Sequence, residues 1–110
     1  MTTEKTAYGK FLAATLDYIQ RKVEDALGPT VEIERTEDTL SIQLEGGHHY
    51  YLNKMELRET IGLASPLSGR HGFYYDKEKD SWISARNNVD LYDLLEDEFT
   101  GLCGCPVPFD

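Results

Sequence analysis

The sequence predicts an α+β two-layer sandwich in which two helices pack on one face of an antiparallel sheet of about six strands. Three observations predict it. An amphipathic helical pattern comes first, short segments rich in aromatic and β-branched residues fill the middle, and a second helical pattern follows. The chain of 110 residues is long enough for one domain with one modest core. We therefore expect a single domain.

The first predicted helix runs from Tyr8 to Leu27. Its apolar residues recur at spacings of three and four, as one buried helical face requires; they are Tyr8, Phe11, Leu12, Leu16, Ile19, Val23 and Leu27. The pair Gly28-Pro29 is expected to end it.

The middle of the chain predicts a meander of strands. Val31 and Ile33, and then Leu40, Ile42 and Leu44, alternate with polar residues, which indicates two half-buried strands. A turn over residues 45–47 follows. Four further short segments bounded by turn-forming residues are then expected to be strands; they are 48–53, 60–64, 73–75 and 82–85.

The last predicted helix begins near Asn87 or Asn88, because either side chain can accept a backbone N–H as an N-terminal cap. It runs to Phe99, and Gly101 is expected to stop it. Its apolar stripe consists of Leu91, Leu94, Leu95 and Phe99.

Charge excludes several kinds of partner. Twenty acidic and eleven basic residues give a formal net charge of −9, which repels phosphate backbones and anionic membrane surfaces and attracts cations and basic protein patches. No apolar run approaches the roughly 20 residues that span a bilayer, and residues 1–5 lack the pattern of a signal peptide. Cys103 and Cys105 are too close to form a stabilising loop and suggest a reducing compartment. We expect no nucleic-acid or membrane partner and no export.

Several short motifs, taken in order, resemble the frataxin family. They are Tyr8 followed by Thr15-Leu16-Asp17, then Asn53-Lys54, the loop from Ala64 to Gly69, Trp82, and the helical pattern from Leu91 to Glu98. The resemblance runs from about Tyr8 to Leu102. It implies a frataxin-like sandwich formed by a single domain over residues 1–102, with a C-terminal tail, residues 103–110, that packs between the helices through Val107 and Phe109.

The same resemblance implies a function. Frataxins bind ferrous or ferric iron weakly through carboxylates and dock on the cysteine desulfurase–scaffold complex that builds iron–sulfur clusters. We therefore expect a non-enzymatic, iron-binding regulator of cluster assembly, with ferroxidase activity as an alternative that some frataxins suggest. The expected state is a monomer that can oligomerise with iron. The expected compartment is the bacterial cytoplasm, with the mitochondrial or mitosomal matrix as the alternative.

The expected iron ligands form an acidic ridge, defined here as Asp17, Glu24, Asp25, Glu32 and Glu34. The three helical residues share one flank with Arg21, and the two strand residues point to one side. Carboxylate oxygens suit hard cations and discriminate poorly between iron, manganese, calcium and magnesium. A plain solvated charged face is the alternative. Arg21 favours that alternative because it can neutralise Asp17 or Asp25.

The residues expected to bind the partner, by resemblance, are Asn53, Lys54, Arg58, Gly62, Ser65, Pro66, Arg70 and Trp82. Gly62 departs from the family, which exposes a tryptophan at this point of the sheet. Two hypotheses follow: a cluster-assembly regulator, or an acidic protein-interaction module with an altered partner site. An aromatic side chain from Tyr50, Tyr51 or Phe73 on the exposed sheet favours the first, and a bare polar sheet favours the second.

Other chemistry is not expected. Adjacent His48 and His49 point to opposite faces of a strand. His71 is expected to be a solvated loop histidine, with a metal or partner role as the alternative. The two cysteines offer only half of a structural zinc site. The sequence shows no phosphate loop or nucleophile elbow, and the serines at 65 and 68 have no assigned histidine and acid partner.

Overall fold

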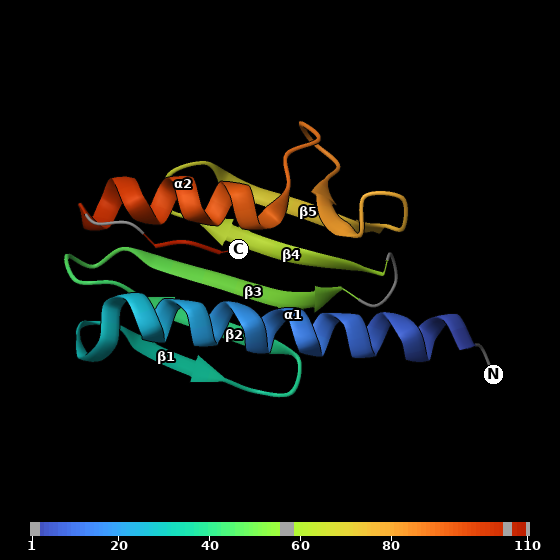
Figure 1. Ribbon diagram of the computed structural model, residues 1–110, viewed down its shortest axis with the longest axis horizontal. Coiled ribbons are helices and arrows are strands. Elements are labelled where there is room, and N and C mark those ends of the chain that lie inside the picture. Colours follow the sequence, from blue (N-terminus) through green and yellow to red (C-terminus); the bar gives the residue numbers. More distant parts are fainter. Residues whose placement is uncertain (1–2, 56–58, 105–106, 110) are drawn as a thin grey trace.

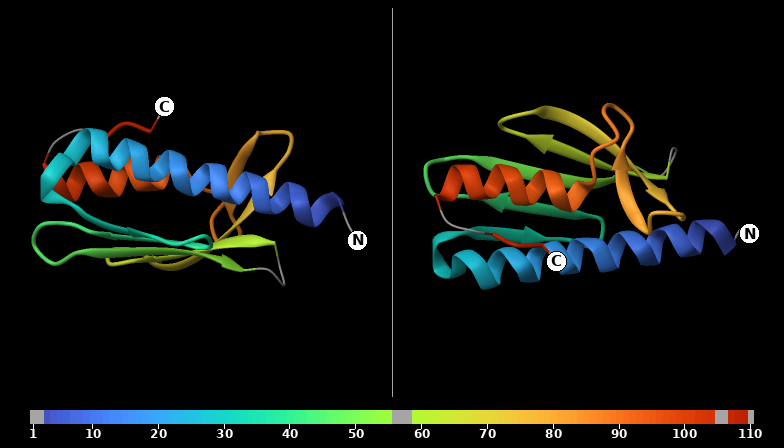
Figure 2. Two further views of the ribbon diagram at one scale, coloured as in Figure 1. Left: turned by 90° about the horizontal axis from the view of Figure 1, so that it is seen from below. Right: turned by 45° about the horizontal axis from the view of Figure 1, so that its top comes forward.

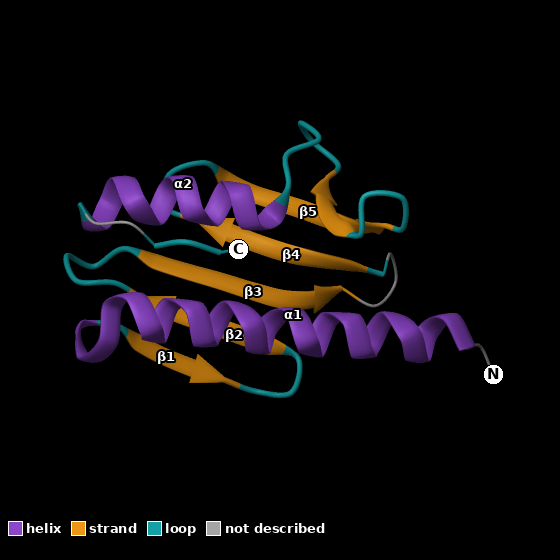
Figure 3. Cartoon of the chain, viewed as in Figure 1, coloured by secondary structure: helices purple, strands orange, loops and turns teal. Residues whose placement is uncertain are grey.

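The structure is a computed structural model that describes residues 3–55, 59–104 and 107–109. Two helices form one layer and a sheet forms the other (Figures 1 and 3). Figure 2 shows both helices on the same side of the sheet, with the opposite sheet face left open. The predicted α+β sandwich is confirmed.

Helix α1, Thr3–Leu27, begins before the predicted start and ends at the predicted glycine. Its residues Leu12, Leu16, Ile19 and Val23 are fully buried, because they lie on the face that the three-four spacing directs toward the sheet. Gly28 adopts a φ of +58°, which stops the α-helix, and a single 3₁₀ turn, Gly28–Thr30, follows. No helix in the described part of the chain is both long enough and apolar enough to cross a membrane.

The six strands lie in the sheet in chain order, and each pairs antiparallel with the next. They are β1 Glu32–Arg35, β2 Thr39–Gln43, β3 His49–Met55, β4 Thr60–Ser65, β5 Gly69–Asp76 and β6 Ser81–Ser84. Strand β5 is longer than predicted, since Gly69, at a φ of +84°, allows a turn tight enough for Arg70 to pair at once with Ala64.

Helix α2, Leu91–Cys103, corrects both predicted ends. Its N-terminal cap is Asp90, whose carboxylate accepts hydrogen bonds from the backbone N–H groups of Tyr92 and Asp93. Asn88, at a φ of +62°, instead lies in a turn. At the other end Gly101 lies within the helix, and Gly104 takes the left-handed conformation that ends it.

The core lies between the sheet and the helices. Its largest fully buried side chains include Tyr50, Phe73 and Phe99, and the rings of Tyr50 and Phe99 meet edge to face at 4.6 Å. Val107 and Phe109 are also buried, and the Phe109 carbonyl accepts a 2.9 Å hydrogen bond from the Tyr18 hydroxyl. The described part of the C-terminal segment therefore contributes to the core between the helices.

Candidate functional site

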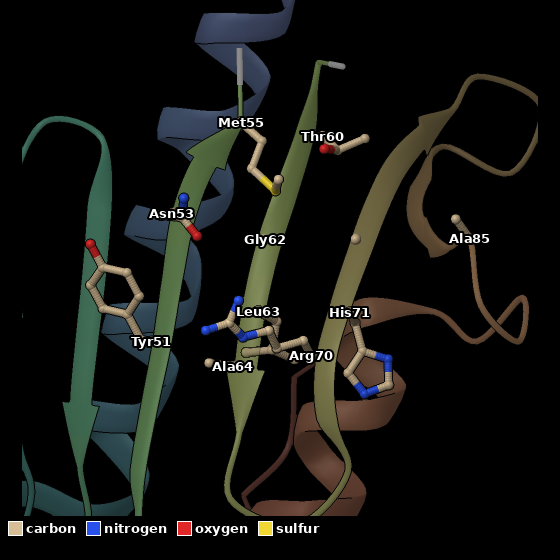
Figure 4. Close-up of a pocket in the computed structure, with 11 residues that line it drawn as sticks. Tyr51, Asn53, Met55, Thr60, Gly62, Leu63, Ala64, Arg70, His71 and Ala85 are labelled. Carbon is tan, nitrogen blue, oxygen red and sulfur yellow. The ribbon is translucent and has the colours of Figure 1, made fainter. Parts of the chain in front are cut away.

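The sheet face opposite the helices, called here the open face, carries a hollow of about 530 Å³. Gly62 of β4 lies directly opposite Gly72 of β5, so two neighbouring positions lack a side chain. Figure 4 shows the residues around this hollow, with Tyr51 and Arg70 at one end and Met55 and Thr60 at the other. Strand alternation places these four residues and the two glycines on one face, whereas Leu63 and His71, which also border the hollow, alternate to the helix side.

The two glycines differ in what covers them. A Cβ atom at Gly62 would lie 2.7 Å from Oδ1 of Asn53 and 2.8 Å from the sulfur of Met55, so these two side chains already lean over that position. A Cβ atom at Gly72 would meet nothing within 4 Å. The free space is therefore over Gly72.

Exposed aromatic residues lie on the open face, and one of them, Tyr51, borders the hollow. Tyr51 and Tyr74 are each 39% exposed and Met55 is 41% exposed, whereas Tyr50 and Phe73 are fully buried on the helix side. Of the three aromatic residues considered from sequence, only Tyr51 reaches the open face, and Tyr74 joins it. The open face is thus not a bare polar surface.

The expected partner-binding residues separate into groups. Asn53, Gly62 and Arg70 lie on the open face around the hollow. Lys54 points to the other side, where its Nζ lies 3.8 Å from the Asp38 carboxylate. Trp82 is 3% exposed within the core. Arg58 lies outside the described residues.

Trp82 and Lys54 therefore do not share the surface that surrounds Gly62. The Trp82 indole N–H donates a 2.7 Å hydrogen bond to Oγ1 of Thr15 on α1, so its polar group serves the packing of helix on sheet. Both residues lie outside the candidate surface.

Ser65 is the last residue of β4 and Pro66 begins the loop to β5, and Glu98 of α2 fixes that loop. The Glu98 carboxylate accepts hydrogen bonds from the hydroxyls of Tyr50 at 2.7 Å, Ser65 at 2.6 Å and Ser68 at 2.6 Å. Burial and the hydrogen bond to Glu98 raise the pKa of Tyr50 far above its ordinary value. The Ser65 hydroxyl thus positions the loop and is not free for a partner.

His71 corrects a prediction, because it is 5% exposed and not solvated. Its Nε2 lies 2.8 Å from the Ser68 hydroxyl. Since Ser68 donates its proton to Glu98, Nε2 must be the donor, which leaves the buried Nδ1 as an acceptor without a hydrogen-bond partner in the described structure. Burial lowers the pKa of His71, and the nearby Arg86 adds to that effect.

Ser68 therefore has a histidine and an acid beside it, which sequence alone did not assign. The direction of these hydrogen bonds, however, is not the one that a catalytic serine requires. A catalytic base must accept the serine proton, whereas here the serine proton goes to Glu98 and the histidine donates to the serine. The three side chains hold the loop in place.

The acidic ridge is divided by the structure. Asp17 forms a 3.0 Å ion pair with Arg35 of β1, so Arg35, and not Arg21, neutralises it. Glu24 and Asp25 are exposed on α1, and the amide of Gln20 donates a 3.3 Å hydrogen bond to Glu24.

Glu32 and Glu34 lie on the opposite sheet face from Arg35, since strand neighbours alternate and Arg35 faces α1. Among the described residues, no three histidine, cysteine or acidic side chains lie close enough to hold one metal ion. The donor set of exposed carboxylates fits weak binding of an oxygen-preferring cation, but it does not form a closed coordination site.

Met55, Gly72 and Tyr74 are not among the residues that the sequence predicts to bind the partner. Met55 and Tyr74 follow from period-two alternation once Asn53 and Gly72 are placed on the open face. No local sequence pattern points to Gly72, because its place in the hollow depends on the strand register that sets it opposite Gly62.

The fold and the open face define a small acidic α+β sandwich, and comparison with known proteins gives its family. The sequence matches the family described as "Frataxin-like domain" over residues 1–105. This chain belongs to the frataxin family.

Named relatives agree with this membership. A protein named "Frataxin, mitochondrial" from Arabidopsis thaliana is 30% identical over 109 residues, which cover 94% of this chain and 58% of that protein. A protein named "Iron-sulfur cluster assembly protein CyaY" from Thioalkalivibrio sulfidiphilus is 31% identical over 80 residues, 73% of each chain. The chain thus spans little more than half of its Arabidopsis relative, and its relatives include both bacterial and mitochondrial proteins.

Solved structures agree with the fold. Frataxin from Psychromonas ingrahamii superposes with a TM-score of 0.85 at 18% identity, covering 96% of this chain and 97% of that one. A trimeric frataxin from Saccharomyces cerevisiae, complexed with ferrous iron, superposes with a TM-score of 0.67 at 27% identity, covering 92% and 87%. The first similarity supports the fold alone.

Proposed function

We propose that this chain is an iron-binding regulator of iron–sulfur cluster assembly that docks on a cysteine desulfurase–scaffold complex through its open face. The observation that supports docking most directly is that two exposed tyrosines, Tyr51 and Tyr74, lie on the same open face as Arg70. Tyrosine and arginine are the residue types that most often dominate binding energy at protein interfaces. The family name of the bacterial relative supports the choice of assembly.

Iron binding in this proposal is weak and uses the exposed carboxylates of the acidic ridge. Glu24 and Asp25 provide one pair on α1, and Glu32 and Glu34 provide another on the edge strand β1. Asp17 contributes less, because Arg35 already neutralises its charge. The ferrous complex of the yeast frataxin supports iron as the metal. We expect a monomer in the absence of iron.

The docking proposal is tested by titrating the protein into a reconstituted desulfurase–scaffold complex. Replacing Tyr51 and Tyr74 together by Ala should weaken binding by about 30-fold to 1000-fold, equivalent to about 2–4 kcal/mol. Phe11→Ala is the matched control, because Phe11 is 42% exposed but lies on α1. Wild-type binding that survives the double substitution would show that the open face is not the docking site.

Iron binding is tested separately, by titrating the free protein with ferrous iron. We expect ferrous iron to bind the free protein weakly, and Glu24→Gln with Asp25→Asn to reduce that binding. Loss of iron binding only after Glu32 and Glu34 are also changed would assign the strand pair as the main site. Unchanged iron binding after all four substitutions would contradict the ridge.

A second function is favoured by one observation. Asp17 is paired with Arg35, so one carboxylate of the acidic ridge is already neutralised, as expected of an acidic protein-interaction module without a metal role. This second function would be supported if the protein docks tightly and if neither ferrous iron nor the four substitutions of the acidic ridge change the affinity.

A further inference from the structure

We propose that the hollow over Gly72 receives an aromatic side chain of the protein partner, and that Arg70 binds a carboxylate next to that ring. This inference rests on the proposed function, because the partner is the desulfurase–scaffold complex. It adds what that function leaves open: the chemistry of the partner residue that this chain recognises.

The hollow has the shape of a slot across the strands. Asn53, Gly62 and Gly72 form one cross-strand row, and the Gly72 carbonyl accepts a 2.9 Å hydrogen bond from the backbone N–H of Ala85. A second cross-strand row, which contains Tyr51, lies on one side of this row, and a third, which contains Met55, lies on the other side. Tyr51 and Met55 are four residues apart along β3, so these two rows are separated by about 13 Å at about 3.3 Å per residue. The floor between these walls is therefore glycine backbone with no side chain over Gly72.

The floor favours an apolar, flat occupant. Strand β4 pairs with β3 and β5, and the Gly72 carbonyl accepts a hydrogen bond from Ala85, so these backbone groups of the floor are used within the sheet. A polar ligand on this floor would lose hydrogen bonds to water without replacing them. A ring gains contact with the glycine backbone and with the polarisable sulfur of Met55, both of which line the hollow.

The charges around the hollow indicate which partner group lies next to that ring. None of the described residues that line the hollow is acidic, although the chain carries 20 acidic residues. The Arg70 guanidinium forms no ion pair or hydrogen bond within the described structure. Figure 4 shows its side chain lying over β4 in the direction of Tyr51. A free arginine at the rim of an otherwise uncharged slot complements a partner carboxylate, which it can bind with two N–H groups.

Gly72 allows a direct test, because a side chain there fills the slot and meets nothing within 4 Å. Its backbone conformation is one that any residue adopts, so Gly72→Leu should leave the sheet intact. Gly101→Leu is the matched control, since Gly101 is also unobstructed but lies on α2. Gly62 is the wrong position for this test, because Asn53 and Met55 would have to move.

The measurement is the affinity of the two leucine variants for the reconstituted desulfurase–scaffold complex. We expect Gly72→Leu to bind about 30-fold more weakly or worse, and Gly101→Leu to bind as the wild type does. If Gly72→Leu keeps full affinity while the Tyr51 and Tyr74 double variant loses it, the open face docks but the slot is empty, and this inference is wrong. If the wild type itself does not bind, the proposed function fails, and this inference fails with it.

A second measurement identifies the ring. Exposed Trp, Tyr and Phe residues of the complex are replaced one at a time by Ala and tested against wild type and Gly72→Leu. The residue that occupies the slot should weaken wild-type binding but have little further effect on Gly72→Leu, because the two changes remove the same contact. Fully additive losses for every aromatic residue would overturn the aromatic occupant. Arg70→Glu should be rescued by reversing the charge of the acidic residue beside that ring.

Discussion

The indole N–H of Trp82 donates a 2.7 Å hydrogen bond to Oγ1 of Thr15, and this bond joins strand β6 to helix α1 inside the core. Trp82 is 3% exposed and Thr15 is 6% exposed, so water cannot replace the bond if it is lost. The family-like tryptophan of this strand is therefore a packing residue here, and the binding surface must be sought on the other face of the sheet.

Thr15→Val should lower the free energy of unfolding by about 1–3 kcal/mol, because it removes the hydroxyl that accepts a hydrogen bond from a buried indole N–H. Urea unfolding followed by tryptophan fluorescence or circular dichroism measures it. The same substitution in a Trp82→Phe background should cost less, since no indole N–H remains there and only the hydrogen bond between Thr15 and Tyr92 is lost. An equal cost in both backgrounds would mean that the hydrogen bond does not stabilise the fold.

Glu98→Gln should destabilise the protein by about 1–3 kcal/mol, because three hydroxyls lose a charged acceptor. Asp97→Asn is the control, since it removes the same charge from an exposed neighbour on the same helix and should change stability by less than about 0.5 kcal/mol. Equal effects of the two substitutions would show that the loss of helix charge, and not the hydroxyl network, is responsible.

His71 should make stability fall at mildly acidic pH. Its pKa in the folded protein lies below the ordinary value of 6.5, so the unfolded chain takes up the proton at a higher pH than the folded one. The free energy of unfolding should therefore decrease as the pH falls from 6.5 through the lower pKa of the folded state.

Urea titrations between pH 5 and 8 test this, by comparing wild type with His71→Gln. The wild type should lose more stability than the variant across that range. His49→Gln, at an exposed strand position, should follow the wild type. If the stability of His71→Gln falls with pH as steeply as that of the wild type, other groups cause the pH dependence.

Arg35→Gln should strengthen the binding of divalent cations at Asp17 by about fivefold, because releasing one exposed carboxylate from its ion pair is equivalent to about 1 kcal/mol. Manganese titration followed by broadening of nearby NMR signals measures it. Arg21→Gln removes the same charge from α1 but leaves the ion pair intact, and it should have a smaller effect. Equal effects would mean that general charge, and not the Arg35 pair, limits binding.

Much of the fold follows from local patterns. The apolar spacing of α1 and the alternation within the strands predict their burial, because one face of each element must be covered. The start of α2 does not follow in this way. Asn87 and Asn88 are as suitable for capping as Asp90 by residue type, but backbone hydrogen bonds from Asn88 to Ser84 and from Ser84 to Val89 hold them in a turn.

The candidate site is less predictable, because it depends on contacts between elements. That Asp17 is neutralised by Arg35 depends on how α1 crosses β1, eighteen residues later. That Tyr74 reaches the open face while Phe73 is buried depends on the true start of β5. The hollow itself arises from the register of Gly62 and Gly72, which neither glycine reveals alone.

The most direct test of the central claim is to map the docking surface by NMR, adding unlabelled desulfurase–scaffold complex to the ¹⁵N-labelled protein. We predict that the amide signals of Tyr51, Gly72 and Tyr74 lose intensity before those of residues on the outer side of α2, such as Asp97. Complex formation that leaves the open-face signals unchanged would contradict the account.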